Sequence, residues 1–488
     1  MSSIHLTRRR LLQAMAAGTC LGALPKSLRA QGAPEPRFLI VMTGTGGASI
    51  IDAMLAIKAS ESSNASLINA YPDALVSEFD GTPFRAIDRE LNSIGPLPYS
   101  GETNQSNFVA RNAQDMMVVT HTGTSVNHLI AQKRSVTGND AWGGKTLQEL
   151  VAENYGESFP IPNVNMGSGG FVEPGVNNSV PPWARGQVVG NPAFFFAGLD
   201  GAKGIVDAPS KSLINLARNV RDNELDVRSV FAKTFGKSEA LELWRANRQK
   251  IPNIESQNLS QKLNLLRSSP GVPLDAFGLA SSPDLDRLRG VFPLMDVDAL
   301  EAQAAMTFLL IKHRVSVAVT MGPNLAPQVG GTQIVDSPPL AYDFSHTAHR
   351  ATQALMWSRL LSVADRLIGL LKAEEYAAGT SFWDRSMIYF ATDFGRSKNR
   401  AANAPDFGSG HHLNNGSLIV SPMSAGNRVL GGVDPNTALT YGFDPMTGSP
   451  TLNRTMTEPE IFAGLLQSLG IDTSPVNLPL VPAMSRRG

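Results

Sequence analysis

Five short apolar runs, separated by segments with helical spacing, constrain the fold of this chain more than any other feature. The runs occupy residues 38–42, 116–120, 315–321, 387–392 and 417–420. Largely apolar runs of this length are typical of strands buried on both faces. Helices are expected at residues 126–155, 297–312, 346–371 and 458–469. Strands that alternate with helices predict an α/β fold, with a mostly parallel central sheet and helices on both faces.

Two segments interrupt this alternation. Residues 157–205 are dense in Gly, Pro and Asn and are expected to form long loops, whereas residues 208–295 are largely helix-like. No internal repeat is evident, and no linker separates two equal halves. The chain has 488 residues, enough to bury one large core. We therefore expect a single domain over residues 31–488, with a helical insertion at about 208–295.

The first thirty residues have the layout of an export signal. They carry five basic and no acidic residues, an apolar stretch at 11–24, and small residues around Ala30. The run at 7–13, with Arg8 and Arg9 before two leucines, resembles a twin-arginine signal. We expect residues 1–30 to be a signal peptide that engages the twin-arginine export machinery and delivers a periplasmic or secreted protein. The alternative is an N-terminal amphipathic helix, although residues 11–24 show no helical stripe.

Charge and cysteine content exclude several classes of protein. The chain has 42 Lys+Arg and 42 Asp+Glu, and removal of the five basic residues of the signal would leave the mature chain mildly acidic. It has no Lys/Arg-rich block, so we expect no nucleic-acid partner. Its one cysteine, Cys20, lies in the signal, which excludes a disulfide framework, a cysteine zinc site and an iron–sulfur cluster. No apolar run reaches the roughly 18 residues of a transmembrane span.

Nucleotide and haem cofactors are not expected either. The glycine-rich turn at 43–47 lacks the third glycine of a dinucleotide-binding motif, where Ser49 stands instead. There is no Walker lysine and no G-x-S-x-G nucleophile elbow. The chemistry of the mature chain must therefore come from its histidine, carboxylate and hydroxyl side chains.

Histidines are concentrated beside the ends of the predicted strands. Six of the eight fall into three pairs, which are His121 and His128, His346 and His349, and His411 and His412. Ligands of open α/β sheets bind outside the carboxyl ends of the strands. One such histidine would usually be a hydrogen-bonded structural residue, but the set predicts a common site.

The second pair lies beside an aspartate at a predicted helix start. Asp343 precedes His346 and His349, with Ser345 as the expected N-cap. Residues three apart share a helix face, and carboxylate with imidazole suits Zn²⁺, Mn²⁺ or Fe. The alternative is that Asp343 caps the helix and the histidines line a wet groove.

The third group begins directly after a predicted strand. Asp393 at the strand end can bind a metal, and Arg396 can hold a phosphate or sulfate with its planar guanidinium. A polar loop then leads to His411 and His412. The kinase interpretation of the DFG sequence at 393–395 fails, because no matching lysine or HRD motif is present.

The first group offers candidate nucleophiles. Thr122 and Ser125 lie at a strand end or helix N-terminus, where backbone N–H groups favour an anion. A hydroxyl there acts as a nucleophile if a metal or base activates it. Ordinary helix capping is an equally weighted alternative.

These stretches together resemble the DUF1501 family of exported bacterial proteins, which in turn resembles the alkaline phosphatase and sulfatase superfamily. The similar stretches are the opening strand and glycine turn at 38–47 and the segments at 127–132, 343–346, 393–397, 411–412 and 461–472. The resemblance implies an alkaline phosphatase-like domain, a site with one or two metals, and a Ser or Thr nucleophile.

The chain also departs from that family. Ala48 and Ser49 stand where the family usually has an aspartate, Asp52 is displaced, and His411 replaces the aspartate of an Asp-His pair. A formylglycine nucleophile is excluded because the mature chain has no cysteine. The loss of two acidic positions weakens the expectation of two metals.

Two functions are consistent with these features. The first is metal-assisted hydrolysis of a small anionic substrate, a phosphate or sulfate ester, with Thr122 or Ser125 as nucleophile and Arg396 holding the anion. The expected ligands are Asp343, His346, Asp393 and His412, with His349 and His411 in support. The second is a non-catalytic binding or assembly protein of the cell envelope that keeps the fold with a degenerate metal site.

Overall fold

The computed structural model describes residues 35–87, 105–138, 143–166, 174–199, 207–236, 255–323, 328–329, 332–333 and 341–486, with isolated positions between 238 and 248. Residues Arg37–Gly488 form one compact unit. The predicted signal peptide, residues 1–30, lies outside the described residues. Among the described residues, no helix is both long and apolar enough to cross a membrane.

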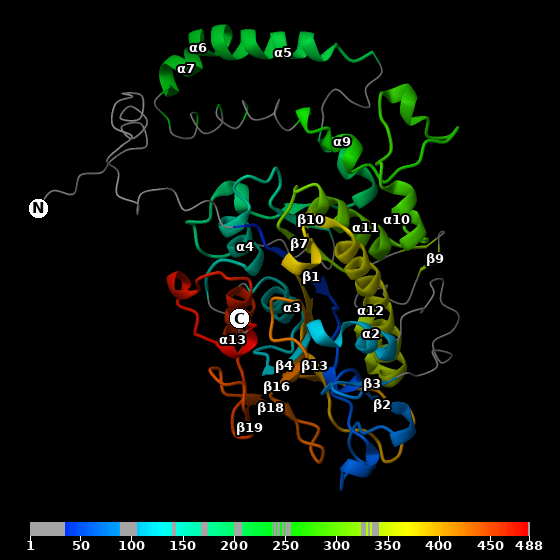
Figure 1. The fold of residues 1–488 in the computed structure, drawn as a ribbon. Coiled ribbons are helices and arrows are strands. Elements are labelled where there is room, and N and C mark those ends of the chain that lie inside the picture. Colours follow the sequence, from blue (N-terminus) through cyan, green and yellow to red (C-terminus); the bar gives the residue numbers. More distant parts are fainter. Residues whose placement is uncertain are drawn as a thin grey trace, which may run out of the picture. The chain divides into compact units, whose positions relative to one another are not determined.

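An eight-stranded sheet forms the centre of this unit (Figure 1). Its order is β16-β4-β15-β12-β1-β7-β5-β6. The strands are β1 (Phe38–Thr43), β4 (Met116–Thr122), β5 (Asn163–Asn165), β6 (Gln187–Val188), β7 (Ala318–Met321), β12 (Ser386–Ala391), β15 (Asn414–Val420) and β16 (Arg428–Leu430). Only β15 runs against its neighbours, so the sheet is mixed but mostly parallel. The predicted α/β fold is thereby confirmed.

The strand β1 is buried along its whole length because it lies between β12 and β7. Its register places Phe38 opposite Ser386 and Thr43 opposite Ala391, and all six of its residues are buried. A strand that is covered on both faces needs apolar residues at every position, which explains the unbroken run at 38–42.

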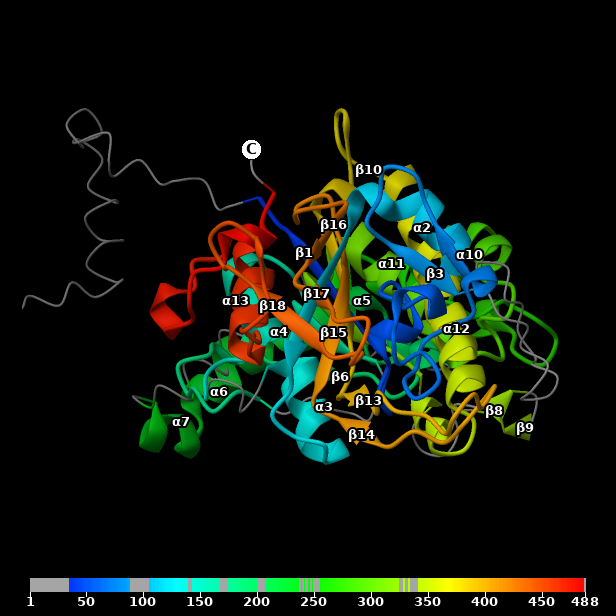
Figure 2. The same ribbon diagram turned by 90° about the horizontal axis from the view of Figure 1, so that it is seen from below.

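Helices cover both faces of the sheet. Figure 2 shows α2 (Gln105–Asn112), α11 (Ala299–Lys312) and α12 (His349–Ala373) on one face, and α4 (Leu147–Tyr155) and α13 (Glu458–Ser468) on the other. Contacts of α12 with α2 and α11, and of α4 with α13, join the helices within each layer. This two-sided covering agrees with the sequence prediction.

Several predicted boundaries differ from the structure. The expected helix at 126–155 is two helices, α3 (His128–Thr137) and α4, because Gly138 adopts a left-handed φ of 71° and ends α3. Three short strands, β5, β6 and β16, were not predicted, and two of them lie in the segment expected to be loops. The antiparallel direction of β15 was not predicted, since an apolar run carries no information on strand direction.

The start of α12 is the correction that matters most for the site. This helix begins at His349, and residues Ala341–His346 form a separate 3₁₀ turn, η11. Ser345 is therefore not the N-cap. The carboxylate of Asp406 caps the helix instead, since it accepts hydrogen bonds from the backbone N–H groups of Arg350 at 2.9 Å and of Ala351 at 3.2 Å.

The segment expected as an insertion is largely helical where it is described. It holds α5 (Lys211–Val220), a five-residue π-helical stretch, α6 (Asp226–Arg228), α7 (Val230–Phe235), α9 (Leu259–Lys262) and α10 (Leu285–Val291). No residue of α5 to α7 is buried. The interpretation of this segment as an insertion into a single domain stays a prediction.

Candidate metal centre

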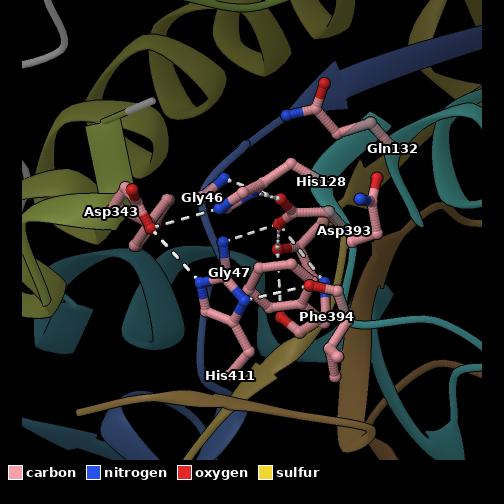
Figure 3. A network of polar contacts seen from close by, with 12 residues as sticks. Gly46, Gly47, His128, Gln132, Asp343, Asp393, Phe394 and His411 are labelled. Atoms are coloured by element: carbon pink, nitrogen blue, oxygen red, sulfur yellow. Dashed lines mark hydrogen bonds and ion pairs between the residues drawn. The ribbon is translucent and has the colours of Figure 1, made fainter. Parts of the chain in front are cut away.

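Three side chains that are far apart in sequence converge at one edge of the sheet (Figure 3). His128 opens α3, Asp343 lies in η11, and His411 belongs to β14 (His411–His412). One ligand atom from each lies within 4.8 Å of the other two. The carboxyl ends of β1, β4 and β12 lie at this edge, because β4 and β12 both run antiparallel to β15.

The two separations from Asp343 fit a tetrahedral ion. Oδ1 of Asp343 lies 3.3 Å from Nε2 of His128 and 3.5 Å from Nε2 of His411. Zinc–nitrogen bonds of about 2.0–2.1 Å at tetrahedral angles place two ligand atoms about 3.3 Å apart. His346 adds a fourth nitrogen, whose Nε2 lies 3.2 Å from Asp343 Oδ1 and 2.9 Å from His411 Nε2.

The imidazoles of His128 and His411 are held in place by hydrogen bonds at their Nδ1 atoms. Nδ1 of His128 lies 2.7 Å from Oδ2 of Asp393, and Nδ1 of His411 lies 2.9 Å from the carbonyl oxygen of Val126. Both partners are acceptors, so each Nδ1 carries a proton and each Nε2 is directed at Asp343. Histidines that bind metals in proteins are oriented in this way.

An aromatic ring supports the same two imidazoles. The ring centroid of Phe394 lies 4.1 Å from that of His411 and 4.8 Å from that of His128. Phe394 is buried, and Figure 3 shows its ring beside both histidines. The packing restricts rotation of the imidazoles about their side-chain bonds.

Asp393 lies behind His128 rather than among the converging ligand atoms. Its carboxylate accepts the backbone N–H groups of Gly46 at 3.1 Å and Gly47 at 2.6 Å, in addition to the contact with His128. Both glycines have positive φ, and a Cβ on Gly46 would lie 2.5 Å from the backbone nitrogen of Asp343. The glycine turn that follows β1 therefore holds Asp393, and through it His128. Asp393 was predicted as a metal ligand, and in this geometry it positions the candidate ligand His128.

Arg396 is fully buried and binds the protein itself. Its guanidinium donates to the carbonyl oxygens of Ser409 at 3.0 Å, Tyr342 at 3.1 Å and Gly46. It also forms an ion pair with Oδ1 of Asp343 at 2.9 Å. These contacts occupy both terminal nitrogens of the guanidinium. Those two atoms therefore have no donor left for the substrate anion that Arg396 was predicted to hold.

The charged groups of the centre shift each other's pKa values. Burial opposes ionisation of Asp343, but hydrogen bonds from His128 and Arg396 outweigh it and hold the pKa of Asp343 well below its usual value. Burial lowers the pKa of His128, but its contacts with Asp343 and Asp393 outweigh burial and raise that pKa to about 9. Binding of a metal at Nε2 of His128 would therefore release a proton.

Two of the predicted ligands lie apart from the converging atoms. His349 is fully buried, with Nε2 at 3.0 Å from Oδ2 of Asp52, so it does not share a face with His346. Asp52 also accepts from Asn69 at 2.8 Å and from Tyr71. His412 follows His411 on the short strand β14, and adjacent strand residues point to opposite sides.

The predicted nucleophiles do not contact the cluster through any hydrogen bond among the described residues. Thr122 ends β4, where its backbone N–H donates to Met456 at 2.8 Å. Ser125 accepts the backbone N–H of Asn127 at 3.1 Å through its hydroxyl oxygen, in the manner of a turn. The cap of α3 is Asn127 rather than Ser125, and the nucleophile interpretation of Ser125 stays a prediction.

His128 is the residue whose role sequence reasoning missed. It was grouped with the other strand-end histidines but was not proposed as a ligand. The available signal was its place directly after Asn127, which caps α3 by accepting the N–H of Ile130. A helix that follows a sheet strand begins near the carboxyl edge of the sheet, where the ligands of open α/β sheets bind.

Comparisons with known proteins give no family. No protein-family model matches the chain, and no curated protein matches it, so the resemblance to DUF1501 stays a prediction. Two crystal structures of Ps i-CgsB, one in complex with k-i-k-neocarrahexaose, match with a TM-score of 0.30 and 10% identity. Each match covers 92% of this chain and 76% of the Ps i-CgsB chain. A likeness this distant carries no argument about function. The structure itself defines the class: an α/β protein with a His/Asp cluster that could hold a metal at the edge of its sheet.

Proposed function

We propose that this protein is a metal-dependent hydrolase of phosphate or sulfate esters, with His128, Asp343 and His411 as metal ligands. The observation that carries the proposal is the convergence of three ligand atoms within 4.8 Å of one another, with both histidines fixed through Nδ1. Unpaired surface histidines would not share this orientation. Two imidazoles and one carboxylate suit zinc best, with manganese or iron as alternatives.

The surroundings favour an anionic substrate. The cluster brings three imidazoles and the guanidinium of Arg396 together with the carboxylates of Asp343 and Asp393. A divalent ion would make the sum positive, which attracts an anion. When bound, the ion would polarise an ester oxygen and lower the pKa of water.

His346 is the side chain best placed to meet the substrate. Its side chain is 47% exposed, compared with 22% for His411 and 23% for His128. Burial and the nearby Arg396 lower the pKa of His346, which favours the neutral form of its ring. A neutral imidazole at the open side can complete the metal site or accept a proton during hydrolysis.

A non-catalytic binding or assembly role in the cell envelope is the second candidate. It is favoured by the bonding of Arg396 to the protein itself and by the absence of any described hydrogen bond between the cluster and the hydroxyls of Thr122 or Ser125. In that case the cluster would hold a metal, or remain an ion-pair network, without turnover.

We further propose that the protein acts in the periplasm or as a secreted protein, exported by the twin-arginine pathway. The proposal is supported by the sequence of residues 1–30 alone. Replacement of Arg8 and Arg9 by lysine should retain the protein in the cytoplasm. Unchanged export of that variant would contradict export by the twin-arginine pathway.

Metal analysis of the full-length protein tests the central proposal. We expect close to one zinc-class ion per chain, hydrolysis of an aryl phosphate or aryl sulfate, and loss of both in His128→Ala. His313→Ala is the matched control, because His313 faces Asp284 at 3.8 Å and lies outside the cluster. Less than about a tenth of an ion per chain, with no hydrolysis, would refute metal-dependent catalysis. Bound metal without hydrolysis would support the second candidate.

A further inference from the structure

The helices α5 to α7 expose a series of large apolar side chains to solvent. Seven of these side chains are between 52% and 78% exposed, and they are Leu213, Leu216, Leu225, Val227, Val230, Phe231 and Phe235. No residue of α5, α6, α7 or the π-helical stretch between α5 and α6 is buried. Single exposed hydrophobic residues are normal on a protein surface, but seven in one short stretch indicate an interaction surface.

The helix α5 is amphipathic, with its apolar side toward solvent. Leu213 and Leu216 are three residues apart and share one side of the helix. Lys211, Asn215 and Asn219 follow one another at intervals of four and lie on the opposite side. The apolar side of a surface helix normally faces the protein core, but the two leucines of α5 are 54% and 58% exposed.

Polar side chains join this stretch to the neighbouring part of the chain. Arg218 of α5 forms an ion pair with the carboxylate of Glu255 at 2.7 Å. Arg248 forms ion pairs with Asp222 of the π-helical stretch and with Asp226 of α6. These ion pairs hold α5 and α6 by charged side chains, so the apolar side chains remain available to a partner.

The helix α7 adds a pair of aromatic rings to the surface. Phe231 and Phe235 lie one helical turn apart, with their ring centroids separated by 5.0 Å. Ser229 separates α6 from α7 with an extended ψ of 149°, and its hydroxyl oxygen caps α7 by accepting the backbone N–H of Ala232 at 3.0 Å. Phenylalanine and leucine are residues that interfacial helices bury at the boundary between lipid headgroups and acyl chains.

The exposed charges of the stretch are mostly positive. Lys211, Arg228 and Lys233 are exposed, and the exposed acid among them is Glu224. The other two acids of the stretch already form ion pairs with Arg248. Two copies of the protein joined through this surface would bring more like charges than opposite charges together. Anionic lipid headgroups would instead complement the basic side chains.

We infer that α5 to α7 bind the surface of a membrane that contains anionic lipids. The exposed apolar side chains would enter the boundary between headgroups and acyl chains, and the exposed basic side chains would contact the headgroups. The helix α5 has ten residues, about half of the length that a bilayer span needs, so it would lie along the membrane surface. The inference does not depend on metal binding, on hydrolysis or on the route of export.

A fluorescent probe in α5 tests this inference in the full-length protein. The variant Leu216→Cys is prepared with Cys20→Ser, which removes the one natural cysteine, and is labelled with the environment-sensitive dye NBD. We expect stronger, blue-shifted emission when vesicles of phosphatidylglycerol and phosphatidylcholine are added, because the dye leaves water. Leu452→Cys with Cys20→Ser is the matched control, since Leu452 is 74% exposed outside α5 to α7, and its emission should not change. Because the dye reports its own surroundings, binding of lipid by residues 1–30 would not produce the signal.

Further substitutions in the labelled Leu216→Cys protein test the apolar and the basic contributions separately. Phe231→Glu should lower the apparent affinity for the vesicles by about tenfold or more, because an aromatic side chain is lost and a charge would have to enter the boundary. Arg228→Gln together with Lys233→Gln should weaken binding to vesicles that contain phosphatidylglycerol. The same pair of substitutions should leave the weaker binding to pure phosphatidylcholine vesicles unchanged.

Three results would overturn the inference. The first is unchanged emission from the Leu216→Cys probe in the presence of phosphatidylglycerol vesicles, and the second is undiminished affinity in the Phe231→Glu variant. The third is a blue shift that appears without vesicles and grows with protein concentration, which would show that a second copy of the chain covers this surface. Circular dichroism of each variant confirms that it is folded.

Discussion

Nδ1 of His128 lies 2.7 Å from Oδ2 of Asp393, and this contact determines which nitrogen of the ring is free to bind a ligand. Asp393 is held by the glycine turn after β1, and His128 opens a helix that follows β4. One hydrogen bond therefore links two strand ends to the orientation of one imidazole. The remaining ligands depend on comparable contacts, which gives predictions that can be tested one residue at a time.

Asp393→Asn should weaken metal binding without removing a ligand. The amide cannot fix the proton on Nδ1 of His128 as a carboxylate does, and loss of such a partner typically lowers metal affinity by about 10–100-fold. Competition with a chromogenic chelator measures the affinity. Asp406→Asn is the control, since Asp406 caps α12 through the N–H groups of Arg350 and Ala351; an equal loss in both variants would contradict the prediction.

Asp406→Ala should destabilise the fold while leaving metal stoichiometry unchanged. The substitution removes the acceptor for the N–H groups of Arg350 and Ala351 at the start of α12, and loss of such a cap costs about 0.5–2 kcal/mol. Urea denaturation of the metal-free protein measures the change. An unaltered free energy of unfolding would show that solvent replaces the carboxylate.

Gly46→Ala and Gly369→Ala should have opposite effects on stability. Gly46 has a φ of 96°, and an added Cβ would lie 2.5 Å from the backbone nitrogen of Asp343, so this variant should lose more than about 2 kcal/mol and its metal site. Gly369 lies within α12, and no atom lies within 4 Å of an added Cβ. That variant should gain about 0.5–1 kcal/mol because alanine favours a helix. Thermal unfolding of both variants compares them directly, and a gain for Gly46→Ala would refute the packing described here.

Lys398→Met should stabilise the protein at pH 7. Burial lowers the pKa of Lys398 in the folded state to about 8, from about 10.5 in an exposed lysine, so the folded state binds its proton less tightly than the unfolded state does. Below pH 8 this difference costs the wild type about 3 kcal/mol, and the cost disappears as pH rises from 8 to 10.5. The advantage of the variant should shrink across that interval in denaturation experiments. A constant difference would show that lost packing, rather than charge, determines the effect.

The sequence was informative where burial alone determines structure. The apolar runs of β1 and β12 predicted strands because both faces of these strands are covered. Short strands such as β6 were missed because two exposed residues carry no apolar pattern. The antiparallel direction of β15 depends on chain connections that the run at 417–420 does not encode.

For the candidate metal centre, the sequence indicated which residues take part more successfully than it indicated how they are arranged in space. Asp343, His346 and His411 were named from the sequence and do lie together. The assumption that His346 and His349 share a helix failed because α12 starts three residues later than predicted, which directs His349 toward Asp52. The role of His128 depends on a hydrogen bond to a residue 265 positions away, a contact that no local pattern records.

The three converging ligand atoms come from residues 128, 343 and 411, so more than half of the chain separates the first from the last. A polypeptide still emerging from the ribosome cannot assemble this site, because His411 would be synthesised after most of the sheet. Metal loading would therefore mark the completion of folding, and a truncated chain would stay empty. A quality-control step that distinguishes metal-loaded from metal-free protein would in effect test whether His128, Asp343 and His411 have come together.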